Sequence, residues 1–180
     1  MNLVETGFDG LFVLEPKVFG DHRGYFFESY NQKTFIDLGI KNNFIQDNES
    51  LSNYGTLRGL HFQKGEFAQA KLVRVVKGSV LDVVVDIRSG SKTYGKSFTC
   101  ELTEQNKKMM MIPRGFAHGF VVLSETAIFQ YKCDNLYSPH NEGGIRFDDP
   151  DLKIDWRVPL DKVLLSDKDK KLPFLKELSK

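Results

Sequence analysis

The sequence predicts an all-β fold: a double-sheet jelly roll, also described as a double-stranded β-helix, with short helices mainly near the C-terminus. Short segments rich in β-branched and aromatic residues recur at close spacing, with Gly, Asn, Asp and Ser between them. Helical patterning is scarce, and a double-sheet roll limits the open strand edges of a small all-β chain. Because residues 1–180 contain no repeat, low-complexity tract or linker, we expect a single domain.

The predicted strands follow the spacing of apolar residues along the chain. Residues 79–87 (SVLDVVVDI) are nearly all apolar, which is typical of a strand with both faces covered. The dipeptide Lys77-Gly78 separates this run from the preceding one and predicts a tight hairpin turn. Residues 34–38 predict one helical turn, and the charged tail 161–178 predicts short helices. The predicted strands are residues 11–18, 25–29, 44–52, 56–62, 71–76, 79–87, 96–102, 107–112, 119–123 and 126–133.

Charge and cysteine content argue against several classes of protein. The formal net charge is +1, so no global field attracts the chain to nucleic acid or to an anionic membrane. The two cysteines, Cys100 and Cys133, are too few for a disulfide framework. No secretory signal is visible, and no apolar run approaches the ~20 residues that a membrane span requires. We therefore expect a cytoplasmic protein that binds neither nucleic acid nor membrane.

The densest polar stretch of the chain spans three consecutive predicted strands. Alternate residues of a strand share a face, so Gln46, Asn48 and the two serines after them project to one side. Arg58 and His61 follow on the next strand, and Lys71 begins the one after. A solvated face is one interpretation. If these strands line a barrel mouth instead, the side chains converge on a cavity suited to an anionic, hydroxyl-rich ligand.

A second cluster, IPRGFAHGF, contains the pattern P-x-G-x-x-H, which resembles the second motif of cupins. Cupins often bind a transition metal through this histidine, here His118, and through a first motif H-x-H-x(3–4)-E-x6-G. Alignment of the first motif on Gly78 matches His61, but Gln63 replaces the second histidine and Lys71 takes the glutamate position. An ammonium would repel a divalent cation, and two ligands would be missing, so we predict no metal site.

A cation beside a histidine suits proton abstraction next to a ketone. That reaction needs a base near the carbon, a cation at the carbonyl oxygen, and an acid on the opposite face if configuration inverts. His61 fits the base, because imidazole is the side chain that titrates near neutral pH. Lys71 fits the enolate oxygen, and Tyr131 fits the acid, although a lone tyrosine on a strand is more often structural. Asp167 and Asp169 both offer a carboxylate to orient the imidazole, unless they belong to a solvated charge run.

Several motifs occur together in the order that one enzyme family shows, from about residue 8 to residue 170. The sequence resembles the dTDP-4-dehydrorhamnose 3,5-epimerases. The motifs are Asp21-His22-Arg23-Gly24-Tyr25-Phe26-Phe27-Glu28, Gln46-x-Asn48-x-Ser50, Gly55-Thr56-Leu57-Arg58-Gly59-Leu60-His61, Lys71-Leu72-Val73-Arg74-Val75, IPRGFAHGF and Ser166-Asp167-Lys168-Asp169.

The resemblance implies a metal-free, cofactor-free homodimer of the cupin type that acts on a dTDP-sugar in the route to dTDP-L-rhamnose, a precursor of bacterial surface polysaccharide, including lipopolysaccharide. The implied reaction converts dTDP-4-dehydro-6-deoxy-D-glucose to dTDP-4-dehydro-L-rhamnose. It assigns the base to His61, its carboxylate partner to Asp169, the enolate contact to Lys71 and the acid to Tyr131.

The resemblance also implies a set of residues that bind the sugar nucleotide. Tyr137 is placed to stack on thymine. Arg23 and Glu28 lie near the N-terminal strands that family members pack across the dimer, so they are expected to serve the neighbouring site. The implied binding residues are Arg23, Glu28, Gln46, Asn48, Arg58, His118, Tyr137, Glu142 and Lys168.

Three alternative functions remain at this point. The nearest is a related enzyme that epimerises one carbon, or a 3,4-ketoisomerase that moves the carbonyl group. A second is a non-catalytic cupin that only binds a sugar nucleotide, although binding alone would not require His61, Lys71, Tyr131 and Asp169 together. A third is a metal-dependent cupin oxygenase.

Overall fold

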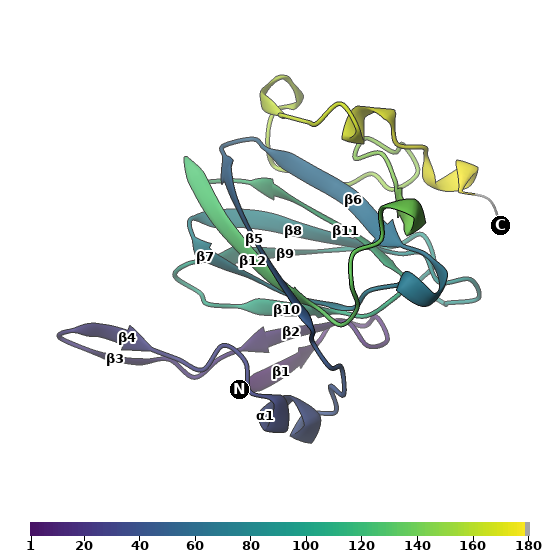
Figure 1. Cartoon of the computed structure of the whole chain (residues 1–180). Helices are drawn as coiled ribbons and strands as arrows, with labels where there is room; N and C mark the ends of the chain where they lie inside the picture. Colours follow the sequence, from purple (N-terminus) through teal and green to yellow (C-terminus); the bar gives the residue numbers. More distant parts are fainter. Residues whose placement is uncertain (179–180) are drawn as a thin grey trace.

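The computed structural model describes residues 1–178 and consists of two packed β-sheets with a projecting hairpin (Figure 1). The strands are β1 (Asn2–Glu5), β2 (Phe12–Glu15), β3 (Phe19–Asp21), β4 (Gly24–Phe26), β5 (Gln46–Asn53), β6 (Leu57–Gln63), β7 (Lys71–Lys77), β8 (Ser79–Asp86), β9 (Ser97–Thr103), β10 (Met109–Ile112), β11 (Phe116–Val122), β12 (Thr126–Cys133) and β13 (Glu142–Gly144). The helices are α1 (Gln32–Asp37) and the 3-10 helices η1 (Gly65–Phe67), η2 (Pro139–Asn141), η3 (Leu160–Lys162), η4 (Asp169–Lys171) and η5 (Leu175–Glu177).

The strands pair antiparallel in two main sheets. The six-stranded sheet has the order β1-β2-β10-β7-β12-β5, and the five-stranded sheet has the order β13-β6-β11-β8-β9. Strands β3 and β4 form the separate hairpin that extends away from both sheets (Figure 1). The predicted all-β, double-sheet fold is therefore confirmed, with short helices concentrated in the C-terminal segment.

Local sequence accounts for most elements. The predicted helical turn is α1, which begins after Asn31, whose side-chain oxygen accepts a hydrogen bond from the Thr34 amide at 3.2 Å. In β5 the even-numbered residues are the more buried ones, as the alternating polar pattern predicts. Strands β1, β3 and β13 were not predicted, because three or four residues carry too little periodicity to be recognised.

The predicted hairpin turn at Lys77-Gly78 is wrong. Strand β7 pairs with β10 and β12, whereas β8 pairs with β11 and β9, so the chain crosses from one sheet to the other at this point. Gly78 has a φ of 79°, and a Cβ there would lie 2.1 Å from the Thr126 carbonyl oxygen. The glycine permits a tight corner between the sheets. A hairpin within one sheet and a crossing between two sheets can both use such a glycine, so the sequence does not distinguish them.

Three layers of apolar side chains hold the sheets together and cover their outer faces. Each fully buried valine, leucine or phenylalanine stabilises the fold by about 1.5–3 kcal/mol. The core between the sheets includes Val73, Val80, Val84, Phe116, Phe120 and Phe129. The outer face of the five-stranded sheet packs under the C-terminal segment through Leu81, Val83, Leu152, Trp156, Val158 and Leu175. The outer face of the six-stranded sheet packs against the α1 region through Leu72, Met109, Phe35 and Ile40.

The C-terminal segment is also tied to the sheet by backbone hydrogen bonds. The Leu57 amide donates to the Leu164 carbonyl, and the Leu164 amide donates to the Gly55 carbonyl, both at 2.9 Å. These bonds place residues 164–169 beside β6, where they can reach the space between the sheets (Figure 1). Within residues 1–178, no helix has the length and apolar character needed to cross a bilayer.

Candidate active site

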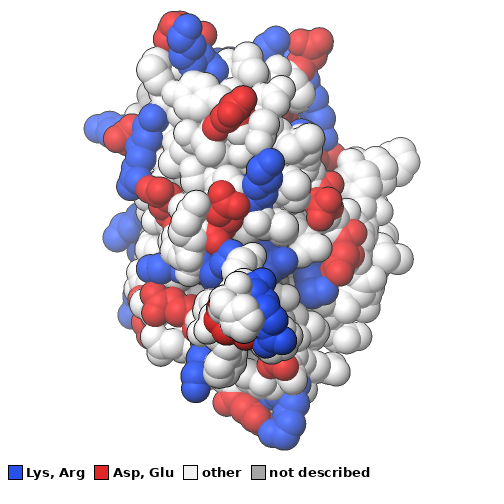
Figure 2. Space-filling model, turned by 90° about the vertical axis from the view of Figure 1, so that its left-hand side faces the viewer, with Lys and Arg blue, Asp and Glu red and all other residues white. Residues whose placement is uncertain are grey.

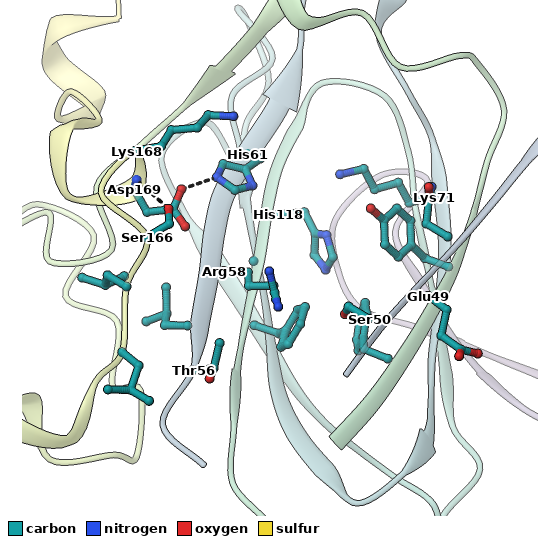
Figure 3. A pocket seen from close by; sticks show the side chains of 18 residues that line it. Glu49, Ser50, Thr56, Arg58, His61, Lys71, His118, Ser166, Lys168 and Asp169 are labelled. Atoms are coloured by element: carbon teal, nitrogen blue, oxygen red, sulfur yellow. Dashed lines mark hydrogen bonds and ion pairs between the residues drawn. The ribbon is translucent and has the colours of Figure 1, made fainter. Parts of the chain in front are cut away.

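A cavity of about 540 Å³ opens between the two sheets (Figure 3). Strands β5, β7 and β12 of one sheet form one wall, strands β6 and β11 of the other sheet form the second, and residues 164–169 close the side. The polar side chains that line it are Asn48, Glu49, Ser50, Thr56, Arg58, His61, Lys71, His118, Tyr131, Ser166, Lys168 and Asp169. Most of the chemistry-bearing residues expected from the sequence therefore meet in this one space.

His61 on β6 forms an imidazole–carboxylate pair with Asp169 of η4. His61 Nε2 lies 2.6 Å from Asp169 Oδ1. Burial is the largest single effect and favours the neutral acid, but the hydrogen bond and charge of His61, together with hydrogen bonds from the Gly59 backbone and Ser166, lower the pKa of Asp169. The Asp169 carboxylate is thus ionised at neutral pH, which orients Nε2–H toward it and leaves Nδ1 free on the cavity side (Figure 3).

The other carboxylate that the sequence offered, Asp167, does not meet the imidazole. Its side chain is 90% exposed and pairs with Lys170 at 3.1 Å. The two positions are separated by one residue, yet the 3-10 turn directs them differently, with Asp169 4% exposed against His61.

Lys71, the first residue of β7, directs its ammonium into the cavity from the wall opposite His61 (Figure 3). Among residues 1–178 no carboxylate lies within ion-pair distance of its nitrogen. Burial lowers the pKa of Lys71, whereas nearby Cys133, Asp82 and Glu142 act in the opposite direction. The side chain places its amine where it can interact with an oxygen in the cavity.

Tyr131 on β12 stands beside Lys71, with the lysine nitrogen 5.7 Å from the centre of its ring. It is the cross-strand partner of Val73 on β7 and of Asn48 on β5, which fixes its direction into the cavity. Burial raises the pKa of the Tyr131 phenol, so the group is protonated at neutral pH. It therefore lies on the wall that faces His61 and holds a proton that it can donate.

His118 on β11 is the cross-strand neighbour of His61, and it forms a second imidazole–carboxylate pair. Its Nε2 lies 3.0 Å from both oxygens of Asp82 on β8. Asp82 was missed by the sequence analysis. The signal was available, because a carboxylate in a strand buried on both faces has to be paired within the fold. The neighbouring Asp86 meets that requirement with Arg88, Ser91 and Thr93, away from the cavity.

The polar residues of β5 and β6 take two different places. Asn48 and Arg58 line the cavity, with Arg58 Nε donating to Ser52 Oγ at 3.1 Å. Gln46 lies toward the rim, where its side-chain oxygen accepts a hydrogen bond from the Tyr137 amide at 3.0 Å. In this structure Gln46 anchors the loop that carries Tyr137.

A hydrogen-bonded group of three side chains forms the rim next to the His61 pair. The Tyr137 hydroxyl donates to Glu142 Oε2 at 2.8 Å, and the Lys168 ammonium donates to the same oxygen. The Tyr137 side chain is 53% exposed, so its ring is accessible from outside the cavity. Lys168 precedes Asp169 in the chain, so the rim and the imidazole–carboxylate pair share one segment.

The residues at the cupin metal positions have other contacts. Gln63 donates to the carbonyls of Phe67 and Leu136 at 2.7 and 3.1 Å and accepts from the Ser138 amide at 2.6 Å. Lys71 occupies the glutamate position with an ammonium. In the part of the chain that the structure describes, no group of three His, Cys, Asp or Glu side chains is arranged to hold a metal ion.

Arg23 and Glu28 are not brought to this cavity. Arg23 lies on the β3–β4 hairpin, 79% exposed and paired with Asp21 at 2.6 Å. Glu28 follows the hairpin and accepts a hydrogen bond from Asn31 at 3.1 Å. The hairpin extends away from the two sheets (Figure 1). Figure 2, which views the molecule from the hairpin side, shows basic and acidic side chains interspersed rather than gathered by sign.

Comparison with known proteins shows which family the chain resembles. The family described as dTDP-4-dehydrorhamnose 3,5-epimerase matches residues 5–177. A protein of that name from Salmonella typhimurium is 54% identical over 157 residues, which cover 87% of this chain and 86% of the relative.

Two solved structures are similar over nearly the whole chain. A dTDP-4-dehydrorhamnose 3,5-epimerase from Elizabethkingia anophelis superposes with a TM-score of 0.95 at 52% identity, covering 100% of this chain and 99% of that one. The Legionella pneumophila enzyme, solved in complex with dTDP-4-keto-L-rhamnose, has a TM-score of 0.95 at 46% identity, covering 99% and 94%. The chain belongs to the dTDP-4-dehydrorhamnose 3,5-epimerase family.

Proposed function

We propose that His61, Asp169, Lys71 and Tyr131 carry out the 3,5-epimerisation of dTDP-4-dehydro-6-deoxy-D-glucose to dTDP-4-dehydro-L-rhamnose. The observation that carries the proposal is the placement of an imidazole and a phenol on facing walls of one cavity, with the amine of Lys71 beside the phenol. Family membership supports the reaction, and this geometry supports the assignment of roles.

Each inversion begins with the hydrogen next to the C4 ketone. The free Nδ1 of His61 takes the proton, the carbon–hydrogen bond breaks, and its electron pair moves to the C4 oxygen as an enolate. The ionised Asp169 stabilises the imidazolium that forms. The Lys71 ammonium stabilises the enolate oxygen, a contact of the kind worth about 3–4 kcal/mol in other enzymes.

Reprotonation from the opposite face completes the inversion. The Tyr131 hydroxyl donates its proton to the carbon while the enolate collapses to the ketone. Water then returns a proton to the phenolate and removes one from His61, whose side chain is 27% exposed. The same set of groups acts at C3 and at C5 once the sugar has shifted in the cavity.

The remaining residues are proposed to hold the nucleotide portion. Arg58 and Lys168 provide cationic donors for the diphosphate, and a guanidinium can donate two parallel hydrogen bonds to it. The exposed Tyr137 ring is proposed to stack on thymine, with Glu142 and Gln46 holding it in place. Asn48 and His118 are proposed to contact the hexose.

A homodimer is part of the proposal, because Arg23 and Glu28 lie outside the cavity of their own chain. The exposed aromatic residues Phe19, Tyr25 and Phe26 of the hairpin are 53%, 59% and 70% exposed, which suits burial against a second copy. Arg23 would then reach the partner's cavity. We further propose that the protein is cytoplasmic, forms one domain, needs no cofactor and binds neither nucleic acid nor membrane.

Incubation with dTDP-4-keto-6-deoxyglucose in deuterated water tests the function. We expect deuterium at both C3 and C5, with the product in the L-rhamno configuration by NMR. Label at one carbon would establish a single-site epimerase, a moved ketone would establish the isomerase, and no label would leave a binding protein. Elemental analysis of active protein tests the metal-dependent alternative, since activity that tracks bound metal would contradict the proposal.

A further inference from the structure

A fully buried carboxylate lies inside the fold next to the proposed active site. Asp82 is 0% exposed on β8, and its side chain shares the inter-sheet face with Val80 and Val84. An ionised carboxylate in an apolar core is strongly unfavourable unless it is paired. Apolar packing alone therefore gives no reason for an aspartate at this position.

The contacts of Asp82 point toward the cavity. Both of its oxygens lie 3.0 Å from Nε2 of His118. Nδ1 of His118 has no hydrogen-bond partner within residues 1–178, and every fully buried side-chain nitrogen or oxygen in that range has one. The Nδ1 atom is consequently accessible from the cavity, which His118 lines. With Nε2–H donated to Asp82, Nδ1 offers a lone pair to a hydroxyl of a bound sugar.

The charge of Asp82 also has no other assigned use. The titratable groups that face Lys71 are Cys133 and Tyr131 on β12, Asp82 on β8, His118 on β11, His61 on β6 and Glu142 on β13. Burial raises the pKa of the Cys133 thiol to about 11, and the Tyr131 phenol is likewise protonated, so neither is an anion at neutral pH. Glu142 is already bound by Lys168 and Tyr137. Asp82 is the remaining carboxylate, and although burial raises its pKa, His118 and Lys71 act in the opposite direction and favour its ionised form.

We infer that Asp82 is a positioning residue for epimerisation: it fixes the His118 ring with Nδ1 toward the sugar, and its carboxylate is the counter-charge for Lys71 inside the cavity. This inference rests on the proposed role of Lys71 at the enolate oxygen. Two neighbouring strands thereby prepare both a hydroxyl contact and a charge at the ketone before the substrate binds.

Asp82→Asn separates these roles from a structural one. Asparagine keeps the shape and can accept from His118 Nε2–H, but it removes the charge. We expect the alkaline limb of the kcat/KM profile to move to lower pH by about one unit or more, because Lys71 loses its counter-charge. The loss of kcat should be about tenfold at the alkaline end and smaller near neutral pH, with KM little changed.

Two further variants supply controls. Asp86→Asn removes a second buried carboxylate from the same strand, but its partners are Arg88, Ser91 and Thr93, so the pH profile should keep its shape. Asp82→Glu keeps the charge and should retain the alkaline limb. A profile for Asp82→Asn that matches the native one, in a protein shown to be folded by circular dichroism, would overturn the inference.

Direct titration of Lys71 by NMR of lysine-labelled protein, assigned with Lys71→Arg, needs neither substrate nor activity. In the native protein we expect the Lys71 amine to be protonated at pH 7, and in Asp82→Asn to lose its proton at lower pH. A neutral amine at pH 7 in the native protein, or identical titrations in both, would overturn the inference. The labelling experiment fails independently if the proposed reaction is wrong, so the two failures are distinguishable.

Discussion

The cavity holds two imidazole–carboxylate pairs on neighbouring strands, and they differ in how the carboxylate is supplied. Asp169 lies 108 residues after His61, in a segment outside the sheets, and the His61 side chain remains 27% exposed. Asp82 comes from the strand next to His118 in the same sheet. The His118 side chain is 7% exposed and the Asp82 side chain is 0% exposed. The His61–Asp169 pair joins a strand to the C-terminal segment at the cavity wall, whereas the His118–Asp82 pair is enclosed within one sheet.

This difference suits two kinds of work. A base has to exchange its proton with solvent in each turnover, so it needs a partner that orients it without sealing it from water. A residue that only fixes a hydrogen bond and a charge is best placed where water cannot compete. The difference supports the proposed roles of the two pairs: proton transfer for the His61 pair and positioning for the His118 pair.

Electrostatics separates the pairs in the same sense. For Asp82, burial is the largest effect and raises the pKa, although His118 and Lys71 oppose it. For Asp169, burial is again the largest single effect, but the contacts with His61, Gly59 and Ser166 together exceed it, and the pKa is lowered. Ionisation of Asp169 is therefore favoured by its surroundings, whereas burial opposes ionisation of Asp82, and His118 and Lys71 are the groups that favour it.

Replacing each histidine tests the comparison most directly. His61→Asn should reduce kcat/KM by about 10³-fold and eliminate deuterium exchange at both carbons, because the base is lost. His118→Asn should reduce kcat/KM by only about tenfold, since it removes one hydrogen bond to the sugar. Exchange is measured by NMR, with the exposed His140→Asn as control. Loss of exchange in His118→Asn with retention in His61→Asn would reverse the two assignments.

The carboxylate of the His61 pair can be tested against its neighbour in sequence. Asp169→Asn should lower kcat by about 10²-fold, because the imidazolium that forms during proton transfer loses its anionic partner. Asp167→Asn is the matched control, since that side chain is 90% exposed and pairs with Lys170, and its kcat should stay within twofold of native. Equal losses in both variants would show that charge in the segment matters rather than contact with His61.

Much of the fold and part of the site could be predicted from the sequence. The alternating polar residues of β5 predict one buried face, and the apolar run of β8 predicts two, because side chains along a strand point to alternate faces. The family resemblance singled out His61, Lys71 and Tyr131, and the three predicted strands that carry them do meet at one cavity. These features depend on a local pattern of residues or on the order of the family's motifs along the chain.

What could not be predicted depends on contacts between distant segments. Nothing near residue 169 shows which of two aspartates turns toward a strand that ended a hundred residues earlier; only the family resemblance favoured Asp169, and the structure places that residue against His61. Lys77-Gly78 reads as a hairpin because a turn signal does not reveal whether the next strand joins the same sheet. Arg23 lies outside the cavity of its own chain, and only the family resemblance, not a pattern in the sequence, led to the expectation that it serves a neighbouring site.

Removal of the Tyr131 hydroxyl tests whether the enclosed pair could instead supply the second proton. Tyr131→Phe should retain deuterium exchange within about threefold while lowering inversion by roughly tenfold or more, because the acid on the far face is lost and the base is not. His118→Asn should slow exchange and inversion equally. Measuring both by NMR distinguishes the acids, and unchanged inversion in Tyr131→Phe would favour His118 for that role.

The smallest expected effect concerns stability in acid, where the two pairs should behave oppositely. The lowered pKa of Asp169 means that its contribution is fully present above the unfolded value near 3.8 and is lost as pH falls through the folded value. Asp169→Asn should therefore lower the free energy of unfolding by about 1.5–3 kcal/mol at neutral pH and by progressively less below pH 4.

The raised pKa of Asp82 gives the opposite sign, so its burial becomes less unfavourable as the carboxyl takes up a proton. Urea unfolding of native protein and both asparagine variants across pH 3–7 measures this, and parallel curves for Asp169→Asn and Asp82→Asn would remove the electrostatic distinction between the pairs.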